Sequence, residues 1–72
     1  MTDTVKLRKL IDNSGLKYKF IAEKMSLSPY GFQKKVDGLL EFKQSEIVVL
    51  CKILKITSLK QMEEIFFAKK VE

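Results

Sequence analysis

The chain has 72 residues, with 14 basic and nine acidic side chains and a formal net charge of +5. This length accommodates one domain with one modest core. Cys51 is the only cysteine and histidine is absent, which excludes an intrachain disulfide and a zinc site built from cysteine and histidine. We therefore expect stability from well-packed helices, with self-association as a further source, and we expect no cofactor.

The lone thiol is typical of a reducing compartment, so a cytoplasmic location is expected. Residues 1–9 carry charges without an apolar stretch behind them, which is unlike a signal peptide. The longest apolar run, residues 47–51, is far too short to span a bilayer. No membrane partner is expected.

The positive charge is concentrated in the first half of the chain. Residues 1–36 contain eight basic and three acidic side chains, whereas residues 37–72 contain six of each. This asymmetry favours one surface for a polyanion and another for packing or self-association. A solvated basic surface without any ligand explains the charge equally well.

Apolar residues recur at helical spacing throughout the chain, so we expect an all-α, compact bundle of about five helices. The first is predicted over residues 4–13 and ends at Gly15, which can adopt the left-handed conformation that follows a helix. The second is predicted over residues 17–25, and residues 26–28 form a tight turn. The inward-facing residues of these two helices are predicted to be Leu7, Leu10, Ile11, Ile21, Ala22 and Met25.

The third helix has the clearest start signal in the chain. Ser28 can cap its N-terminus, and Pro29 occupies the first helical position, where a missing N–H group costs nothing. Phe32 and Val36 lie one turn apart and are predicted to anchor the helix in the core. The helix is predicted to stop at Asp37.

A loop over residues 38–43, with Phe42 turned inward, leads to a fourth helix over residues 44–54. The fifth starts at Ser58, which has with Gln61 the spacing of a capping box, in which each side chain satisfies a free backbone donor of the other residue. The inward-facing residues of these helices are predicted to be Ile47, Leu50, Cys51, Leu54, Leu59, Met62, Ile65 and Phe66.

Residues 17–38 resemble the helix-turn-helix of phage Cro/CI-type repressors. The resemblance is carried by Ile21-Ala22, Met25-Ser26-Leu27, Phe32 and Val36-Asp37-Gly38. The following segment resembles the fourth helix and loop of small family members from Gram-positive temperate phages, through Glu41-Phe42-Lys43-Gln44-Ser45-Glu46-Ile47 and Ile53-Leu54-Lys55-Ile56. The whole chain is similar to the compact phage proteins called modulators of repression. This implies a single helix-turn-helix domain over residues 1–72, with a fold like the lambda repressor DNA-binding domain, and a role in a lysis–lysogeny switch.

In this family the outward face of the third helix enters the DNA major groove. Tyr30 and Lys34 lie opposite Phe32 on the helix, and Gln33 flanks them. The resemblance therefore implies base contacts by Pro29, Tyr30, Gln33 and Lys34. Gln33 would pair with an adenine edge, Lys34 would donate to guanine, and Tyr30 would contact a thymine methyl group.

Phosphate contacts are implied at the start of the second helix, where Lys17, Tyr18 and Lys19 combine free backbone N–H groups with positive charge. The remaining members of the implied DNA-binding set are Ser28, Lys35 and Lys43.

Two departures from the family pattern favour a surface that contacts protein. Pro29 and Gly31 offer no hydrogen-bonding side chain, and Gly31 weakens the helix by about 1 kcal/mol relative to alanine. Leu39 and Leu40 stand where the family usually has a polar residue, although they could instead fold back onto the core. The protein interface implied here consists of Tyr30, Gly31, Gln33, Lys34, Leu39 and Leu40.

Three functional interpretations remain open. The chain is a Cro-like repressor of operator DNA, an antirepressor that binds a partner phage repressor, or a structural helical module. A plain sequence-specific repressor without a protein partner is the main alternative to a regulator that uses both. Val48, Val49, Phe67 and Val71 are apolar but lie off the inward-facing stripes, so we expect either a weak homodimer through the C-terminal half or use of the same patch for a partner.

Catalysis is not expected, and neither is a small-molecule substrate. The absence of histidine removes the commonest acid–base group, and no glycine-rich phosphate loop is present. Glu63 and Glu64 are neighbours on a predicted helix and point in different directions, so they do not form a catalytic pair. Cys51 lies on an apolar face and is expected to be a buried structural residue.

Overall fold

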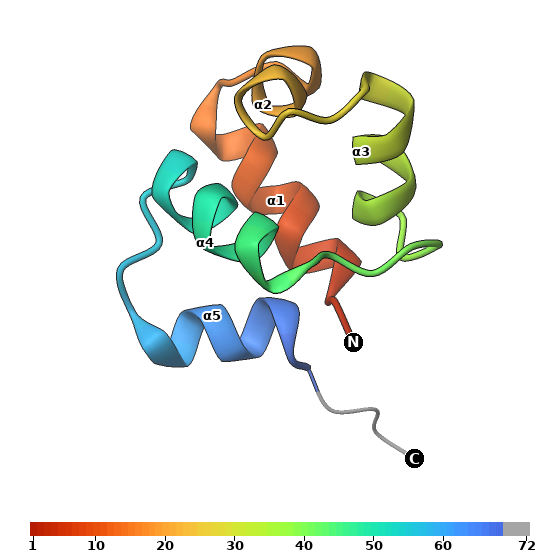
Figure 1. Cartoon of the computed structure of the whole chain (residues 1–72). Coiled ribbons are helices and arrows are strands. Elements are labelled where there is room, and N and C mark those ends of the chain that lie inside the picture. Colours follow the sequence, from red (N-terminus) through yellow and green to blue (C-terminus); the bar gives the residue numbers. More distant parts are fainter. Residues whose placement is uncertain (69–72) are drawn as a thin grey trace.

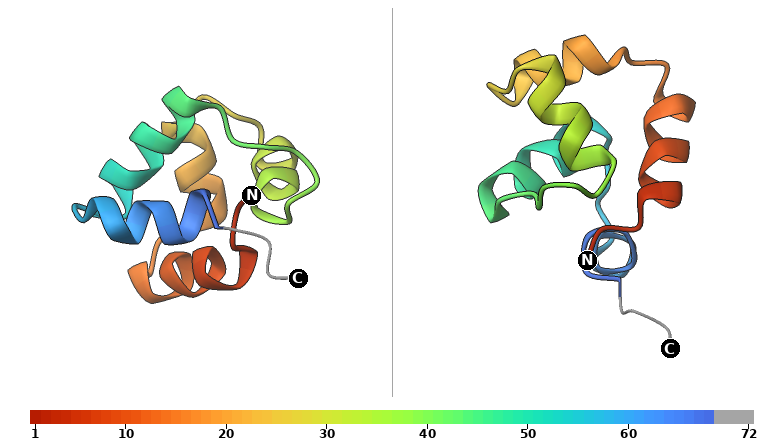
Figure 2. Two further views of the ribbon diagram at one scale, coloured as in Figure 1. Left: turned by 90° about the horizontal axis from the view of Figure 1, so that it is seen from below. Right: turned by 90° about the vertical axis from the view of Figure 1, so that its right-hand side faces the viewer.

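The computed structural model describes residues 1–68, which fold into five α-helices without a strand. In chain order these are α1 (Thr4–Ser14), α2 (Tyr18–Lys24), α3 (Pro29–Val36), α4 (Gln44–Ile53) and α5 (Leu59–Phe66). Helix α2 lies at one end of the bundle and α5 at the opposite end, with α1 and α4 between them (Figure 1 and Figure 2). The all-α fold class and the five-helix architecture are therefore confirmed.

Short polar side chains start three of the five helices. The Ser28 hydroxyl accepts a hydrogen bond from the Gly31 N–H group at 3.0 Å, as predicted, and Pro29 is in the first turn of α3. Asp3 caps α1 by accepting from the Lys6 N–H group at 3.0 Å. Each cap satisfies one of the backbone donors that a helix start leaves free.

The start of α5 follows the prediction in part. The Ser58 hydroxyl accepts from the Gln61 N–H group at 3.3 Å. The reciprocal hydrogen bond from the Ser58 N–H group to the Gln61 side chain is not present within residues 1–68.

The C-terminal end of α1 is as predicted. Gly15 ends this helix with a φ of 74°, the left-handed conformation expected of it.

The core is formed by one apolar cluster that reaches every helix. A row of aromatic rings runs through it, with centroid separations of 5.8 Å from Tyr18 to Phe32, 6.3 Å from Phe32 to Phe42 and 5.7 Å from Phe42 to Phe66. Tilted and edge-to-face ring pairs at these distances stabilise a core beyond the area that they bury. The buried apolar residues are Leu7, Ile11, Ile21, Ala22, Met25, Phe32, Val36, Phe42, Ile47, Leu50, Cys51, Ile65 and Phe66.

One predicted core residue is wrong. Leu59 is 65% exposed, because it occupies the first turn of α5 at the edge of the bundle. Leu10, Leu54 and Met62 are only partly buried and pack against the outside of the cluster. Val71, which was predicted to lie off the inward-facing stripes, falls within residues 69–72, outside the described residues.

The two ends of the described chain are joined by backbone hydrogen bonds. The Asp3 N–H group donates to the Ile65 carbonyl at 2.6 Å, and the Ala68 N–H group donates to the Met1 carbonyl at 2.9 Å. Helix α5 is thereby held against the start of α1. Among residues 1–68, no helix has the length and apolar character needed to cross a membrane.

Candidate nucleic-acid interface

Helices α2 and α3 are joined by a tight turn and pack closely on each other. Ala22 is fully buried on α2, as expected where two helices cross closely. The turn is closed by a hydrogen bond from the Leu27 N–H group to the Ala22 carbonyl at 2.9 Å, and Ser26 has a φ of 58°. A positive φ is unusual for a residue other than glycine. This turn fixes the angle at which α3 leaves α2.

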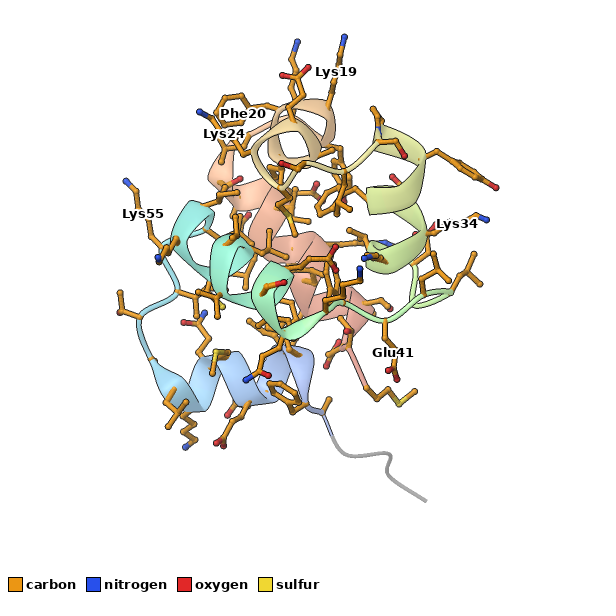
Figure 3. All side chains as sticks on the ribbon, viewed as in Figure 1. Lys19, Phe20, Lys24, Lys34, Glu41 and Lys55 are labelled. Atoms are coloured by element: carbon orange, nitrogen blue, oxygen red, sulfur yellow. The ribbon has the colours of Figure 1, made fainter. Side chains whose placement is uncertain are left out.

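Buried anchors set the rotation of α3 about its own axis. Phe32 and Val36 have no exposed surface, so the opposite side of the helix faces solvent. Tyr30 is 70% exposed there, and the Lys34 ammonium group lies 4.6 Å from the centre of its ring. Figure 3 shows Lys34 projecting from α3 away from the bundle. We call the side formed by Pro29, Tyr30, Gln33 and Lys34 the outer face of α3.

Gln33 on this face is held by Asp37, which forms an ion pair with Arg8 that the sequence analysis did not predict. Its Nε2 group donates to Asp37 Oδ1 at 3.0 Å, and the Arg8 guanidinium group of α1 donates to the same oxygen. The spacing of four residues between Gln33 and Asp37 is a readable signal for a contact on one helix. Arg8 lies 29 residues from Asp37 in the chain, and no local pattern predicts that contact.

The predicted phosphate contact by Lys35 is wrong. Lys35 is 8% exposed, and its ammonium group pairs with Glu46 Oε1 at 2.5 Å. The rotation that turns Phe32 and Val36 inward brings Lys35 to the flank of α3 that faces the start of α4. Its charge is therefore neutralised inside the protein and is not available to a phosphate group.

Glu46 has a second structural task at the start of α4. Its Oε1 atom also accepts from the Lys43 N–H group at 2.7 Å. Burial raises the pKa of Glu46, but the hydrogen bonds and charges of Lys35 and Lys43 outweigh that effect, so its pKa is lowered overall. The carboxylate is thus held in its charged form between two helices.

The start of α2 presents free backbone donors with lysines on either side. Lys17 occupies the N-cap position without a capping side chain, and both Lys17 and Lys19 are exposed. Lys19 points away from the bundle in Figure 3. Tyr18 between them is half-buried against Phe32, and burial, together with the nearby acids Asp12 and Asp37, raises its pKa. Its hydroxyl therefore stays protonated.

The other two residues of the predicted DNA-binding set lie at helix starts. Lys43 is exposed at the N-cap of α4. Ser28 is also exposed, but its hydroxyl is engaged by the Gly31 N–H group. A phosphate contact by Ser28 would therefore have to share the oxygen that caps α3.

Leu39 and Leu40 do not fold back onto the core. They are 71% and 48% exposed in the loop after α3. The N–H groups of both residues donate to the Lys34 carbonyl, at 2.9 and 3.3 Å, so the loop wraps around the end of α3. The two leucines form an apolar surface directly after the outer face of that helix.

A second exposed aromatic side chain was missed by the sequence analysis. Phe20 on α2 is 44% exposed, and the Lys24 ammonium group lies 5.5 Å from the centre of its ring. Figure 3 shows both side chains on the outside of α2. Their spacing of four residues is the only sequence signal for this contact.

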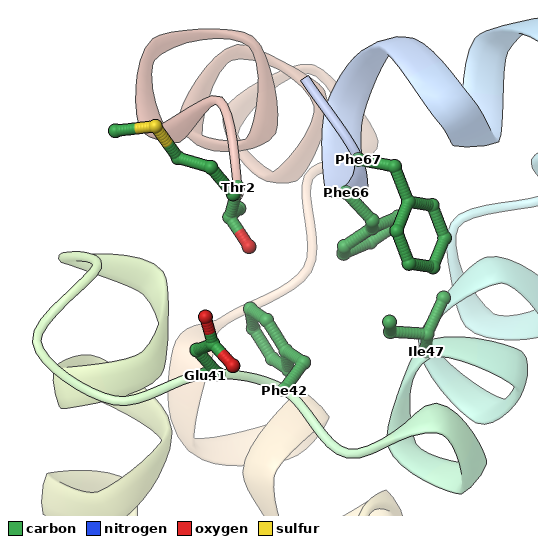
Figure 4. A pocket seen from close by; sticks show the side chains of 7 residues that line it. Thr2, Glu41, Phe42, Ile47, Phe66 and Phe67 are labelled. Carbon is green, nitrogen blue, oxygen red and sulfur yellow. The ribbon is translucent and has the colours of Figure 1, made fainter. Parts of the chain in front are cut away.

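A small pocket lies away from α2 and α3, where the start of the chain meets the loop before α4 and the end of α5 (Figure 4). Its volume is about 160 Å³. Phe42, Ile47 and Phe66 form an apolar wall, and Glu41 brings one carboxylate. Within residues 1–68 no three side chains of the metal-binding types cluster together. Cys51 is buried, as predicted, and burial raises its pKa.

Comparisons of this chain with protein-family models, with curated proteins and with solved structures find no match.

Proposed function

We propose that this protein is a phage transcriptional regulator, acting in a lysis–lysogeny type of switch in the cytoplasm of the bacterial host. In this proposal it binds operator DNA with the outer face of α3. The observation that carries the proposal is the placement of Tyr30, Gln33 and Lys34 on one solvent-facing side of α3. The resemblance to Cro/CI-type repressors over residues 17–38 supplies the expectation that this side enters a major groove. The proposal includes no enzymatic activity and no cofactor.

The chemistry of the outer face suits the edges of base pairs. The amide of Gln33 can donate to adenine N7 and accept from adenine N6, and the ammonium group of Lys34 can donate to guanine. Lys34 is already held over the ring of Tyr30, which limits the conformations that it must give up on binding. Two side chains of this kind read a short site, which is why a second copy on a neighbouring half-site is part of the proposal.

Phosphate binding is assigned to the start of α2 and to Lys43. Backbone N–H groups that lack a side-chain cap attract a phosphate at a helix start, and Lys17 and Lys19 add positive charge beside them. Lys35 is excluded from this role because Glu46 already neutralises it.

The test is selection of preferred sequences from random DNA by the full chain, followed by titration at several salt concentrations. We expect one preferred sequence, and we expect Gln33→Ala and Lys34→Ala to lose the preference at single base pairs. Lys60→Ala is the matched control, because it removes an exposed charge from α5 at the far end of the bundle. Binding that shows no sequence preference, or equal losses in all three variants, would rule out base recognition by α3.

A second candidate function is favoured by the exposed leucines. Tyr30, Leu39 and Leu40 form an apolar surface with a charged neighbour in Lys34, which is the composition of a protein-binding hot spot. In this function the protein is an antirepressor that binds a partner phage repressor. Tyr30→Ala and Leu40→Asp should each weaken binding to the repressor of the same phage by about 1–3 kcal/mol. Wild-type affinity in both variants would leave the plain repressor as the better explanation.

A further inference from the structure

We propose that Asp37 is a positioning residue that sets the base preference of Gln33, and that Arg8 of α1 holds Asp37 in place for this purpose. The inference rests on the proposed function, because it assigns a role within DNA recognition. It adds two residues to the site: Asp37, one turn after Gln33, and Arg8 on α1.

The contact between Gln33 and Asp37 removes an ambiguity of the glutamine side chain. A glutamine amide can rotate by half a turn and exchange its donor for its acceptor. A carboxylate only accepts hydrogen bonds, so the bond of 3.0 Å to Asp37 Oδ1 requires the NH₂ end of Gln33 to face Asp37. The donor end of the amide is thereby directed towards Asp37 before any DNA is bound.

The fixed amide still offers the groups that adenine requires. In the arrangement that we propose, Asp37 takes the N–H of Nε2 that points away from Oε1. The second N–H and the Oε1 atom of Gln33 then remain as one donor and one acceptor side by side, the pair that adenine N7 and N6 match. A free glutamine has to lose rotational freedom to achieve the same alignment, so the contact favours adenine by preorganisation.

The position of Asp37 in the helix argues that it serves more than stability. Asp37 is the C-cap residue of α3, where the helix dipole disfavours a negative charge. Its side chain also lies beside a surface proposed to meet phosphates. Arg8 offsets both effects, because its guanidinium group donates to the same Oδ1 atom that binds Gln33. Since Arg8 belongs to α1, the orientation of Gln33 is tied to the body of the bundle.

The decisive variant is Asp37→Asn, which keeps the size of the side chain. An asparagine amide both donates and accepts, so it can bind Gln33 in either orientation. We expect the preference at the base pair read by Gln33 to fall by about tenfold, within the range of one good base contact. Preferences at the other base pairs should remain, and Arg8→Gln should produce a smaller loss at the same pair.

The experiment is sequence selection by the full wild-type chain and by Asp37→Asn, Gln33→Ala and Glu41→Gln. Glu41→Gln is the matched control, because it removes one carboxylate from the loop after α3 and should strengthen binding to all sequences alike. In the free protein, NMR signals of the Gln33 NH₂ group should shift in Asp37→Asn and stay unchanged in Glu41→Gln. This readout distinguishes positioning from a general loss of structure.

Three results would overturn the inference. Full wild-type preference in Asp37→Asn, where Gln33→Ala has lost it, would reject the role of Asp37 while leaving DNA recognition by α3 intact. Unchanged Gln33 NH₂ signals in Asp37→Asn would reject the contact itself. A wild-type chain without any sequence preference would overturn this inference and the proposed function together.

Discussion

At the scale of single residues, the ion pair between Lys35 and Glu46 shows that not every lysine of the basic half is free to bind a ligand. Their side chains are only 10% and 11% exposed, and the pair joins the end of α3 to the start of α4. Removing one member of such a pair leaves the other charged in a poorly solvated place. The pair therefore belongs to the fold, although Lys35 stands in a basic run beside Lys34.

This distinction gives a prediction for Lys35→Met. The variant should lower the free energy of unfolding by about 3 kcal/mol, because Glu46 loses its counter-charge. It should leave the salt dependence of DNA binding unchanged once the protein is folded. Urea unfolding and a salt titration of DNA affinity measure the two effects. A flatter salt dependence in Lys35→Met would mean that Lys35 does reach a phosphate.

The lowered pKa of Glu46 predicts a dependence of stability on acid. A carboxyl group whose pKa is lower in the folded than in the unfolded protein stabilises the fold above its unfolded pKa. That contribution should be complete above the ordinary value of 4.5 and should be lost as the pH falls through the lowered folded value. Glu46→Gln should be less stable at neutral pH and should lose less stability on acidification.

Urea unfolding between pH 7 and pH 3 checks this expectation, with Glu41→Gln as a control that keeps the Lys35–Glu46 pair. If Glu46→Gln loses stability with acid as steeply as the wild type, other carboxyl groups govern the acid response.

At the scale of secondary structure elements, the start of α2 makes a prediction about binding to phosphate. Lys17 and Lys19 are exposed beside uncapped backbone donors. Each phosphate contact that a lysine makes contributes about one unit to the slope of log affinity against log salt. The double variant Lys17→Ala, Lys19→Ala should therefore flatten the slope by about two. Lys52→Ala with Lys60→Ala is the matched control, and an equal slope in both double variants would contradict the assignment.

The cap of α3 explains why a glycine, Gly31, occupies the first half of this helix, and this explanation can be tested. Alanine is favoured over glycine within a helix by about 1 kcal/mol. A Cβ atom at Gly31, however, would lie 3.0 Å from Ser28 Oγ, the atom that caps the helix. In the wild type, Gly31→Ala should therefore raise the free energy of unfolding by well under about 1 kcal/mol.

In a Ser28→Gly background, Gly31→Ala should raise the free energy of unfolding by the full amount of about 1 kcal/mol. Glycine is tolerated at the N-cap position, and it removes the hydroxyl that obstructs the new Cβ atom. Thermal unfolding of the two single variants and the double variant measures this coupling. Additive effects on the free energy of unfolding would show that alanine at position 31 does not weaken the hydrogen bond of the Ser28 cap.

At the scale of the whole molecule, the charge-neutral half carries apolar side chains that the bundle leaves outside. Val48 is 47% exposed and Val49 is 37% exposed on α4, and Phe67 after α5 is 54% exposed. Regulators of the helix-turn-helix type commonly pair to read two half-sites. We therefore expect weak self-association through this half, which would leave the outer face of α3 free in each copy.

Sedimentation at concentrations up to about 1 mM tests this expectation, since weak dimers have dissociation constants of that order. Val48→Asp and Phe67→Asp should each shift the protein towards monomer, whereas Leu39→Asp, on the loop after α3, should not. A wild-type chain that stays monomeric throughout, alone and on DNA, would mean that these side chains serve another contact.

Local chemistry made the helices and most of their inward faces predictable from the sequence. Ser28 and Pro29 act on backbone groups within one turn, and Gly15 ends α1 through its own dihedral angles. The spacing of Phe32 and Val36 likewise defines the inner side of α3, and through it the outer face. Such features depend on neighbours three or four residues away, so they can be predicted from the sequence alone.

Only the tertiary structure decided which polar groups are free. Lys35 meets Glu46 eleven residues further along the chain, and Arg8 meets Asp37 across 29 residues. Leu59 has the spacing of a core residue, yet no neighbour covers it within the described bundle. These outcomes depend on how whole helices are placed against one another, and periodicity along one helix carries no information about the charge or the surface that a distant helix will bring to it.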